Sequence, residues 1–298
     1  MNSASRLRRA FYVTVTVLSV TPFLLLWGEW TEPSAVTPGF LVFGAVFVLL
    51  VLVGRWDITS YYSRAALLMA FLLICQRKGG PMASLGAVTL VLLLRAWLSH
   101  PPTKPIIELS FPLRNGWYYV AHGGAWHIVN YHASNKSQRF ALDIVRLNSL
   151  GFRARGLYPS RLKAYAIFHD VLYSPCNGRV TAVVNDLPDL PPGEMDSERV
   201  AGNHIVIQCT GGDTFIGLAH LARGSICVNP RDVVGAGQRL AQIGNSGNTS
   251  EPHLHIHAKR GGRPGSMLDG EGVAIRFGGR WLIRNSVIHE APANPTSS

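Results

Sequence analysis

The chain has 298 residues, which is enough for about two domains at ~150 residues each, and 47% of its residues are hydrophobic. Its formal net charge of +11 is shared almost evenly, since residues 1–100 hold 8 Lys/Arg against 3 Asp/Glu and the remainder holds 20 against 14. This spread of charge suits work near anionic lipid or an acidic polymer, and the absence of a helix-turn-helix, zinc-finger or aromatic RNA-binding signature excludes nucleic acid as an expected partner.

The first predicted element is an apolar run of 18 residues, Phe11 to Gly28, which follows three arginines near the N-terminus. A secretory signal peptide begins in the same way, but its apolar region is usually shorter and ends at a small-residue cleavage site. Here Trp27, Glu29 and Trp30 stand at the end of the run, as they would at a membrane interface. The pattern therefore favours a transmembrane helix that is retained in the mature protein.

Two further apolar runs, Phe40 to Val53 and Met82 to Leu98, come close to the ~20 residues that cross a bilayer core. Between them, Ala65 to Cys75 offers 11 residues, which suits an interfacial helix or a short additional span. The sequence thus predicts a membrane-spanning region at residues 1–100 with three helices, or four if the short segment also crosses.

The basic residues favour three spans over four. With three spans, the lysine and arginines between residues 55 and 78 stay on the same side as the N-terminal arginines, which the positive-inside rule assigns to the cytoplasm. Everything after about His100 is then exported. We therefore expect a multi-pass protein of a bacterial inner membrane whose C-terminal domain faces the periplasm or the outside. Four spans would leave that domain in the cytoplasm.

The composition changes after the last apolar run. Three prolines between residues 101 and 105 indicate a linker at 101–115. We expect a soluble domain at 116–290 and a flexible tail at 291–298. The expected fold class is therefore N-terminal α-helical transmembrane segments followed by a soluble domain.

Short β-prone runs separated by Gly, Pro, Asn and Asp predict that the soluble domain is mainly antiparallel β. These runs are Arg179 to Val184, His204 to Cys209, Phe215 to Ala219 and His253 to Ala258. The proline-containing stretch from Asp186 to Gly202 does not suit the interior of a strand or helix and predicts a long surface loop.

The four cysteines give no clear framework. Cys75, Cys176, Cys209 and Cys227 form no CxxC pair, and they fit neither a dense disulfide network nor a structural zinc module. Because three of them fall in the soluble domain, at least one of those three is unpaired. The sequence does not indicate their redox state.

The segment His253-Leu254-His255-Ile256-His257 carries the most informative chemistry. On a β-strand alternate side chains face the same way, so the three histidines project from one face and the two apolar residues from the other. Imidazoles at this spacing can serve one metal site, and imidazole suits zinc among several metals. The alternative is a polar strand face on which the histidines have no role.

Motifs before this segment extend the pattern. In chain order they are Phe140-Ala141-Leu142-Asp143-Ile144, Tyr173-Ser174-Pro175-Cys176-Asn177-Gly178-Arg179-Val180, Gly202-Asn203-His204-Ile205-Val206-Ile207, His220-Leu221 and the glycine-rich stretch Val233 to Thr249. Together with Pro252-His253-Leu254-His255, this set resembles peptidase family M23, the lysostaphin-like or LytM-type peptidoglycan endopeptidases, over about residues 130–260. The resemblance implies a compact β-sheet domain of the lysostaphin-like peptidase fold, with zinc in a groove.

The resemblance also implies roles for single residues. Asp143 and His255 match two zinc ligands of the family, while His220 and His253 would flank the metal-bound water. There they would act as general base and as stabiliser of the developing oxyanion. With one more ligand this would be the usual open catalytic zinc site, which has three protein ligands.

The chain departs from the family at that third ligand. Members carry a histidine four residues before the aspartate, where this chain has Arg139, and a guanidinium offers no free lone pair to a metal. We expect His132, which lies 11 residues before Asp143, to return beside it through a strand-turn-strand. His122 and His127 are the other candidates.

Three more histidines are not expected to bind the metal or to take part in catalysis directly. His257 stands where the family commonly places an acid, so it could support a ligand from outside. His204 stands at a position that is often aromatic in the family, which predicts groove lining or a core role. His169 is expected to be a surface residue.

Together these observations predict a membrane-anchored zinc metallopeptidase that hydrolyses peptide bonds in peptidoglycan stem peptides or cross-bridges. Peptidoglycan carries free carboxylates, which suits the net +6 of residues 101–298. The alternative is a catalytically inactive domain that binds cell wall or activates another hydrolase, and Arg139 is its main support. A peptidase that cleaves protein would share the same site. The scissile bond, protein partners and oligomeric state are not in the sequence.

Overall fold

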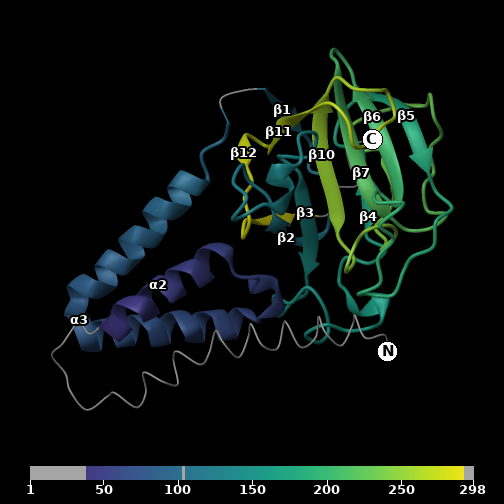
Figure 1. Cartoon of the computed structure of the whole chain (residues 1–298). Helices are drawn as coiled ribbons and strands as arrows, with labels where there is room; N and C mark the ends of the chain where they lie inside the picture. Colours follow the sequence, from purple (N-terminus) through teal and green to yellow (C-terminus); the bar gives the residue numbers. More distant parts are fainter. Residues whose placement is uncertain (1–37, 103–104, 292–298) are drawn as a thin grey trace. The chain divides into compact units, whose positions relative to one another are not determined.

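The computed structural model describes residues 38–102 and 105–291. The chain divides into two compact units, Met1–Leu98 and Ser99–Ser298. Helices make up the described part of the first unit, and strands dominate the second (Figure 1).

The first unit contains α2 (Pro38–Val53), the short 3-10 helix η1 (Trp56–Ile58) and α3 (Tyr61–Leu98). α2 contains the apolar run predicted from Phe40 to Val53. The segments Ala65 to Cys75 and Met82 to Leu98 were predicted as separate elements, and this is wrong, because both lie in α3, one helix of 38 residues.

A physical reason for the error lies in the charges between those two segments. Arg77 and Lys78 interrupt the apolar pattern, but charged side chains do not interrupt the backbone hydrogen bonds of a helix. The sequence Gly79-Gly80-Pro81 follows inside α3. Figure 1 draws α3 as two arms that meet at a sharp bend.

The transmembrane prediction gains no support from the described helices. Within residues 38–102 and 105–291, none of the helices combines the length and the sustained apolarity that a bilayer crossing requires. The first predicted span, Phe11 to Gly28, lies outside the described residues.

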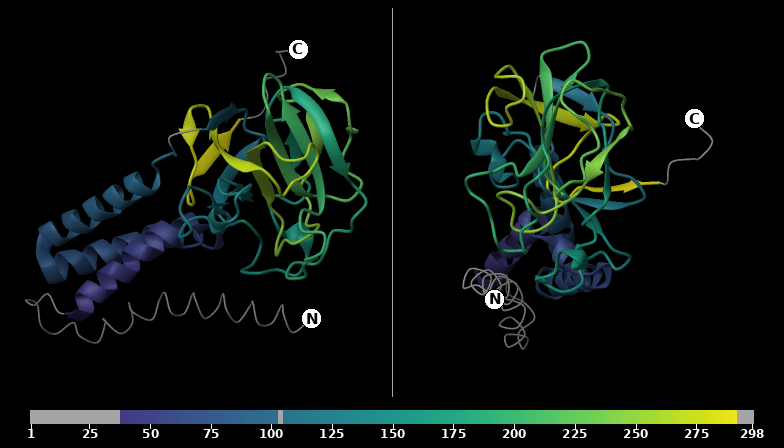
Figure 2. Two further views of the ribbon diagram at one scale, coloured as in Figure 1. Left: turned by 45° about the horizontal axis from the view of Figure 1, so that its top comes forward. Right: turned by 90° about the vertical axis from the view of Figure 1, so that its right-hand side faces the viewer.

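The second unit is built on an 11-stranded sheet whose main path runs β13-β2-β3-β10-β7-β6-β5-β8, with β11 joining β10 to β1 and β12. Every pair in it is antiparallel except β1 with β11. Figure 2 shows the twist of this sheet from two further directions. The strands are β1 (Ile106–Leu109), β2 (Gly116–His122), β3 (Leu142–Leu147), β5 (Gly178–Val184), β6 (Asn203–Cys209), β7 (Thr214–Leu221), β8 (Val233–Val234), β10 (Leu254–Arg260), β11 (Glu271–Phe277), β12 (Arg280–Trp281) and β13 (Val287–Glu290). The predicted mainly antiparallel β fold is confirmed.

Smaller elements complete the domain. A two-stranded sheet pairs β4 (Val171–Tyr173) with β9 (Arg239–Gln242), and two 3-10 helices, η2 (Tyr131–Ser134) and η3 (Leu162–Ala164), lie between strands. β1 falls inside the segment predicted to be a linker, residues 101–115. It pairs with Ala274–Phe277, a partner so distant in the sequence that no local pattern could indicate it.

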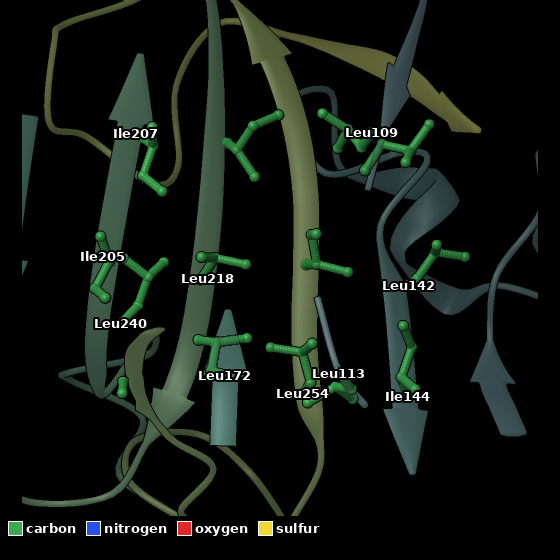
Figure 3. Close-up of a cluster of buried hydrophobic side chains, with 14 of the residues drawn as sticks. Leu109, Leu113, Leu142, Ile144, Leu172, Ile205, Ile207, Leu218, Leu240 and Leu254 are labelled. Carbon is green, nitrogen blue, oxygen red and sulfur yellow. The ribbon is translucent and has the colours of Figure 1, made fainter. Parts of the chain in front are cut away.

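The hydrophobic core lies against one face of the main sheet (Figure 3). Leu254 and Ile256 of β10 are fully buried in it, as the alternation on that strand predicts. Burial of each such side chain contributes about 1.5–3 kcal/mol relative to exposure. Because these residues fix the face of β10 that meets the core, they also fix the opposite direction for His255 and His257, which alternate with them.

Residues 186–202 form no helix or strand, in agreement with the predicted loop. The loop is held at its ends by buried Asn203, which bonds both the backbone N–H and the carbonyl oxygen of Leu187, at 2.9 and 2.8 Å. In its middle, the Gly193 N–H donates to the carbonyl oxygen of Ser250 at 2.8 Å. The loop is therefore fastened to the segment that precedes β10.

Candidate active site

His132 lies on η2, which is held in place by the fully buried Asn130. The Asn130 Oδ1 accepts a hydrogen bond from the backbone N–H of His132 at 3.2 Å. Its Nδ2 donates to the carbonyl oxygens of Gly124 and Ala141, at 2.8 and 3.2 Å. Since Ala141 immediately precedes β3, one amide side chain fixes η2 against the start of that strand.

Asp143 and His255 face each other because β3 and β10 pair with these two residues in register. The Nδ1 of His255 lies 2.9 Å from Oδ1 of Asp143, and the Nε2 of His132 lies 3.1 Å from both carboxylate oxygens. All three residues are buried, and their candidate ligand atoms lie within 4.8 Å of one another. The structure thus brings together the three residues predicted as metal ligands.

The two histidines predicted to be catalytic border this cluster. The Nε2 of His253 lies 3.5 Å from Oδ1 of Asp143, and the ring centroids of His220 and His253 are 4.9 Å apart. The Nδ1 of His253 donates to the carbonyl oxygen of Glu251 at 2.9 Å, and that of His220 to Ser246 at 2.9 Å. A carbonyl can only accept, so each imidazole keeps a lone pair on Nε2 when it is neutral.

The backbone of His220 is unusual. Its φ of 62° lies in the left-handed region, which residues other than glycine rarely adopt. Its N–H donates to the carbonyl oxygen of Ala201 at 3.1 Å, and its own carbonyl accepts from the Gly244 N–H at 3.0 Å. The loop 186–202 and the turn before β10 therefore hold this residue in a strained conformation, as is common at functional sites.

Burial and mutual charge set the protonation of these side chains. Burial lowers the pKa of His255 to about 4 and that of His220 well below its usual value. Burial alone would raise the pKa of Asp143, but His132 and His253 hold it well below its usual range. Burial also opposes a proton on His253, yet the Asp143 carboxylate raises the pKa of this imidazole. The cluster thus has an ionised carboxylate beside the neutral rings of His220 and His255.

The cluster lines a cavity of about 360 Å³, a size that accommodates a short peptide segment. Neutral polar side chains come from η2 and the residues after it, and apolar ones come from the loop 186–202 and from Met267. Within the described part of the chain, no Asp, Glu, Lys or Arg lines this cavity. The lining residues outside the histidine cluster include Tyr131, Ser134, Asn135, Gln138, Val200 and Ala201.

The other candidates for the third ligand lie elsewhere. Arg139 places its guanidinium carbon 4.8 Å from the centre of the Phe140 ring. The Nδ1 of His122 lies 3.3 Å from a guanidinium nitrogen of Arg284, and His127 is exposed on a turn. Among the described residues, neither histidine belongs to the cluster of possible metal ligands, which consists of His132, Asp143 and His255.

His257 is fully buried, and its Nδ1 lies 3.1 Å from the Nε2 of His255. His204 is half-buried, with its Nδ1 donating to the carbonyl oxygen of Gly202 at 2.8 Å. The sequence reasoning missed Tyr131, whose ring centroid lies 3.9 Å from that of His132 and whose hydroxyl pKa is raised by burial and by the Asp143 carboxylate. Its position next to His132 was the one available signal.

Residues 169–266 match the model of peptidase family M23. We call the unit that contains this segment the M23 domain. His132 and Asp143 precede the matched segment of the M23 domain, whereas His220, His253 and His255 lie within it. The family is zinc-dependent, and the buried His, Asp and His donors of the M23 domain are of the kind that binds zinc.

Solved structures of M23-type peptidases are similar to the chain. A zinc-containing peptidase from Vibrio cholerae is 27% identical over 32% of this chain and 24% of its own, with a TM-score of 0.25. LytU is 27% identical over 33% of this chain and 60% of its own, with a TM-score of 0.27. The catalytic domain of lysostaphin from Staphylococcus simulans is 19% identical over 37% of this chain and 79% of its own, with a TM-score of 0.26. No curated protein matches the chain.

Proposed function

We propose that the M23 domain is a zinc metalloendopeptidase that hydrolyses peptide bonds in peptidoglycan stem peptides or cross-bridges. The observation that carries this proposal is the convergence of His132 with Asp143 and His255. This chain lacks the family's histidine four residues before the aspartate, and His132 supplies an imidazole nitrogen 3.1 Å from that carboxylate instead. A decayed site would have no reason to keep a buried histidine there.

His132, Asp143 and His255 would hold the metal. Zinc bound by three such ligands lowers the pKa of a water molecule and polarises the carbonyl of the scissile bond. The Asn130 hydrogen bonds fix His132, and the pairing of β3 with β10 fixes the other two. The donors are therefore oriented by the fold before any metal arrives, which reduces the ordering that metal binding must supply.

His220 and His253 would handle protons beside the substrate. Both donate from Nδ1 to backbone carbonyls, which orients the Nε2 atoms. His220, whose pKa is held well below its usual value, suits a neutral imidazole that accepts a proton. His253, whose pKa is raised by Asp143, suits an imidazole that donates a proton or hydrogen bond to a developing oxyanion.

The cavity lining outside the histidines fits a neutral or weakly charged peptide backbone, since it presents amides and hydroxyls and no Asp, Glu, Lys or Arg within the described residues. The net +6 of residues 101–298 supports attraction to the free carboxylates of peptidoglycan at longer range. The chemistry of the site by itself also fits cleavage of a peptide bond in protein.

A digestion of peptidoglycan tests the proposed function. The purified full chain, loaded with zinc, is incubated with sacculi and with cross-linked muropeptides, and new amino groups are counted. We expect release of amines that stops with a chelator and resumes when zinc is restored. If the chain binds zinc but cleaves only protein substrates, the proposed substrate class is wrong. A chain that binds no zinc would support the inactive wall-binding alternative.

We further propose that residues 1–100 anchor the chain in a bacterial inner membrane, with the M23 domain in the periplasm or outside. The apolar sequence Phe11 to Gly28 and the Lys/Arg distribution support this, as do the large apolar side chains that α3 exposes. They include Leu68, Met69, Leu73, Leu92, Leu93 and Trp97. A reporter fused after His100 is expected to be active outside the cytoplasm, and activity in the cytoplasm alone would reverse the orientation.

His257 is expected to set the tautomer of His255. When the Nε2–H of His255 donates to the Nδ1 of His257, its own Nδ1 is left with the lone pair that faces Asp143. His257→Leu should weaken zinc affinity by about 10–100-fold, the usual effect of losing such a partner. His257→Gln keeps an acceptor and should retain most of the affinity. Zinc titration with a competing chelator checks both variants, and equal losses would mean that His257 acts only by packing.

A further inference from the structure

Cys176 and Cys209 are brought together by the pairing of β5 with β6. Cys209 lies opposite Gly178 in this pairing. The two chains stay paired beyond the strand ends, since the Thr210 N–H donates to the carbonyl oxygen of Asn177 at 2.9 Å. Opposite and alternate residues share a face of a sheet, so the side chains of Cys176 and Cys209 lie on one face. Gly178 has no side chain to separate them, and Cys176 packs against the core cluster that contains Cys209.

The two thiols are close enough to shift each other's pKa. The neighbouring Cys209 raises the pKa of Cys176, and Cys176 lowers the pKa of Cys209, although burial acts in the opposite direction on Cys209. The pair therefore contains one thiol that ionises more readily than its neighbour, and the thiolate is the nucleophile in exchange with disulfides.

The other two cysteines lack such a neighbour. Cys227 is exposed, and its Sγ lies 3.2 Å from the carbonyl oxygen of Leu240. Cys75 is buried in the first unit, where it packs with Phe47 and Phe71. The contact between Cys176 and Cys209 is thus specific within the described residues.

We propose that Cys176 and Cys209 are a disulfide-forming site that reacts with a disulfide donor, either a protein thiol oxidase or glutathione disulfide. One thiolate attacks the donor and displaces one donor thiol, and the second protein thiol then displaces the other. The two protein thiols release two protons, one S–S bond forms, and the donor disulfide is reduced to two thiols. Both cysteines line a cavity of about 990 Å³, which gives the donor access.

The bond would join the ends of a segment that includes the whole loop 186–202. This loop lines the candidate active site through Val200 and Ala201. A cross-link between its flanking strands constrains the unfolded chain and so stabilises the folded domain. The histidine cluster takes no part in the bond, so this inference does not depend on the proposed peptidase function.

Thiol mapping of the native full chain tests the site. The reduced protein is incubated with glutathione disulfide, free thiols are blocked with an alkylating reagent, and the digested protein is analysed by mass spectrometry. We expect a cross-linked pair of peptides containing Cys176 and Cys209. The cross-linked domain should melt higher than the reduced one by on the order of 5–10 °C.

Single variants provide the controls. Cys209→Ser and Cys176→Ala should each abolish the cross-linked peptide and the difference in melting temperature, whereas Cys227→Ser should keep both. The proposal is overturned if both thiols remain open to alkylation after native oxidation. A cross-link that appears only when the protein is oxidised in denaturant would overturn it as well.

Discussion

Replacement of His132 by alanine is expected to remove most of the zinc from the M23 domain, and the peptidase activity with it. The imidazole of His132 lies 3.1 Å from both oxygens of Asp143, in the place where it completes three donors. Two protein ligands rarely hold zinc against buffer, because a catalytic site normally uses three. The loss of affinity should exceed the about 10–100-fold that follows removal of an outer partner.

His122→Ala is the matched control for this experiment. His122 is also an imidazole near η2, with its ring 4.7 Å from that of Tyr131, but it lies outside the ligand cluster. The His122→Ala variant should keep both its zinc, as measured by metal analysis after gel filtration, and its activity. Full zinc in His132→Ala would show that the third ligand is wrongly assigned. Loss of zinc in the His122 variant instead would transfer that role to His122.

His220→Ala is expected to show the opposite combination, with zinc retained and turnover reduced on the order of 10²–10⁴-fold, the usual contribution of a general acid or base. His220 lies outside the three-ligand cluster, with its ring 5.9 Å from that of His255. Its Nδ1 donates to Ser246, so Nε2 is the atom available for a proton. Its removal should therefore affect chemistry more than metal binding.

Metal analysis and peptide cleavage on the same preparation separate these two outcomes. His204→Ala is a suitable control, because His204 is a half-buried histidine that does not line the cavity. It should keep both zinc and turnover. If His220→Ala loses its zinc together with its activity, His220 is a ligand rather than a proton carrier. If it keeps full turnover, the proton must move through His253 alone.

Local sequence patterns were sufficient to predict the strand β10 and the peptidase family. Alternation of His253, His255 and His257 with Leu254 and Ile256 predicted a strand with a polar face and a core face, and the burial of the two apolar residues agrees. The ordered motifs predicted peptidase family M23, which the match over residues 169–266 confirms. Such predictions succeed because strand periodicity and turn chemistry are local properties. The roles of single residues in metal binding and catalysis stay predictions.

Only the tertiary structure could show which of His122, His127 and His132 lies with Asp143 and His255. That placement depends on the Asn130 hydrogen bonds that hold η2 against β3 and on the pairing of β3 with β10 across more than a hundred residues. The parallel pairing of β1 with β11 and the contact of Cys176 with Cys209 are of the same kind. Sequence determines which side chains are present and the face each takes on its own element, whereas long-range pairing decides which of them meet.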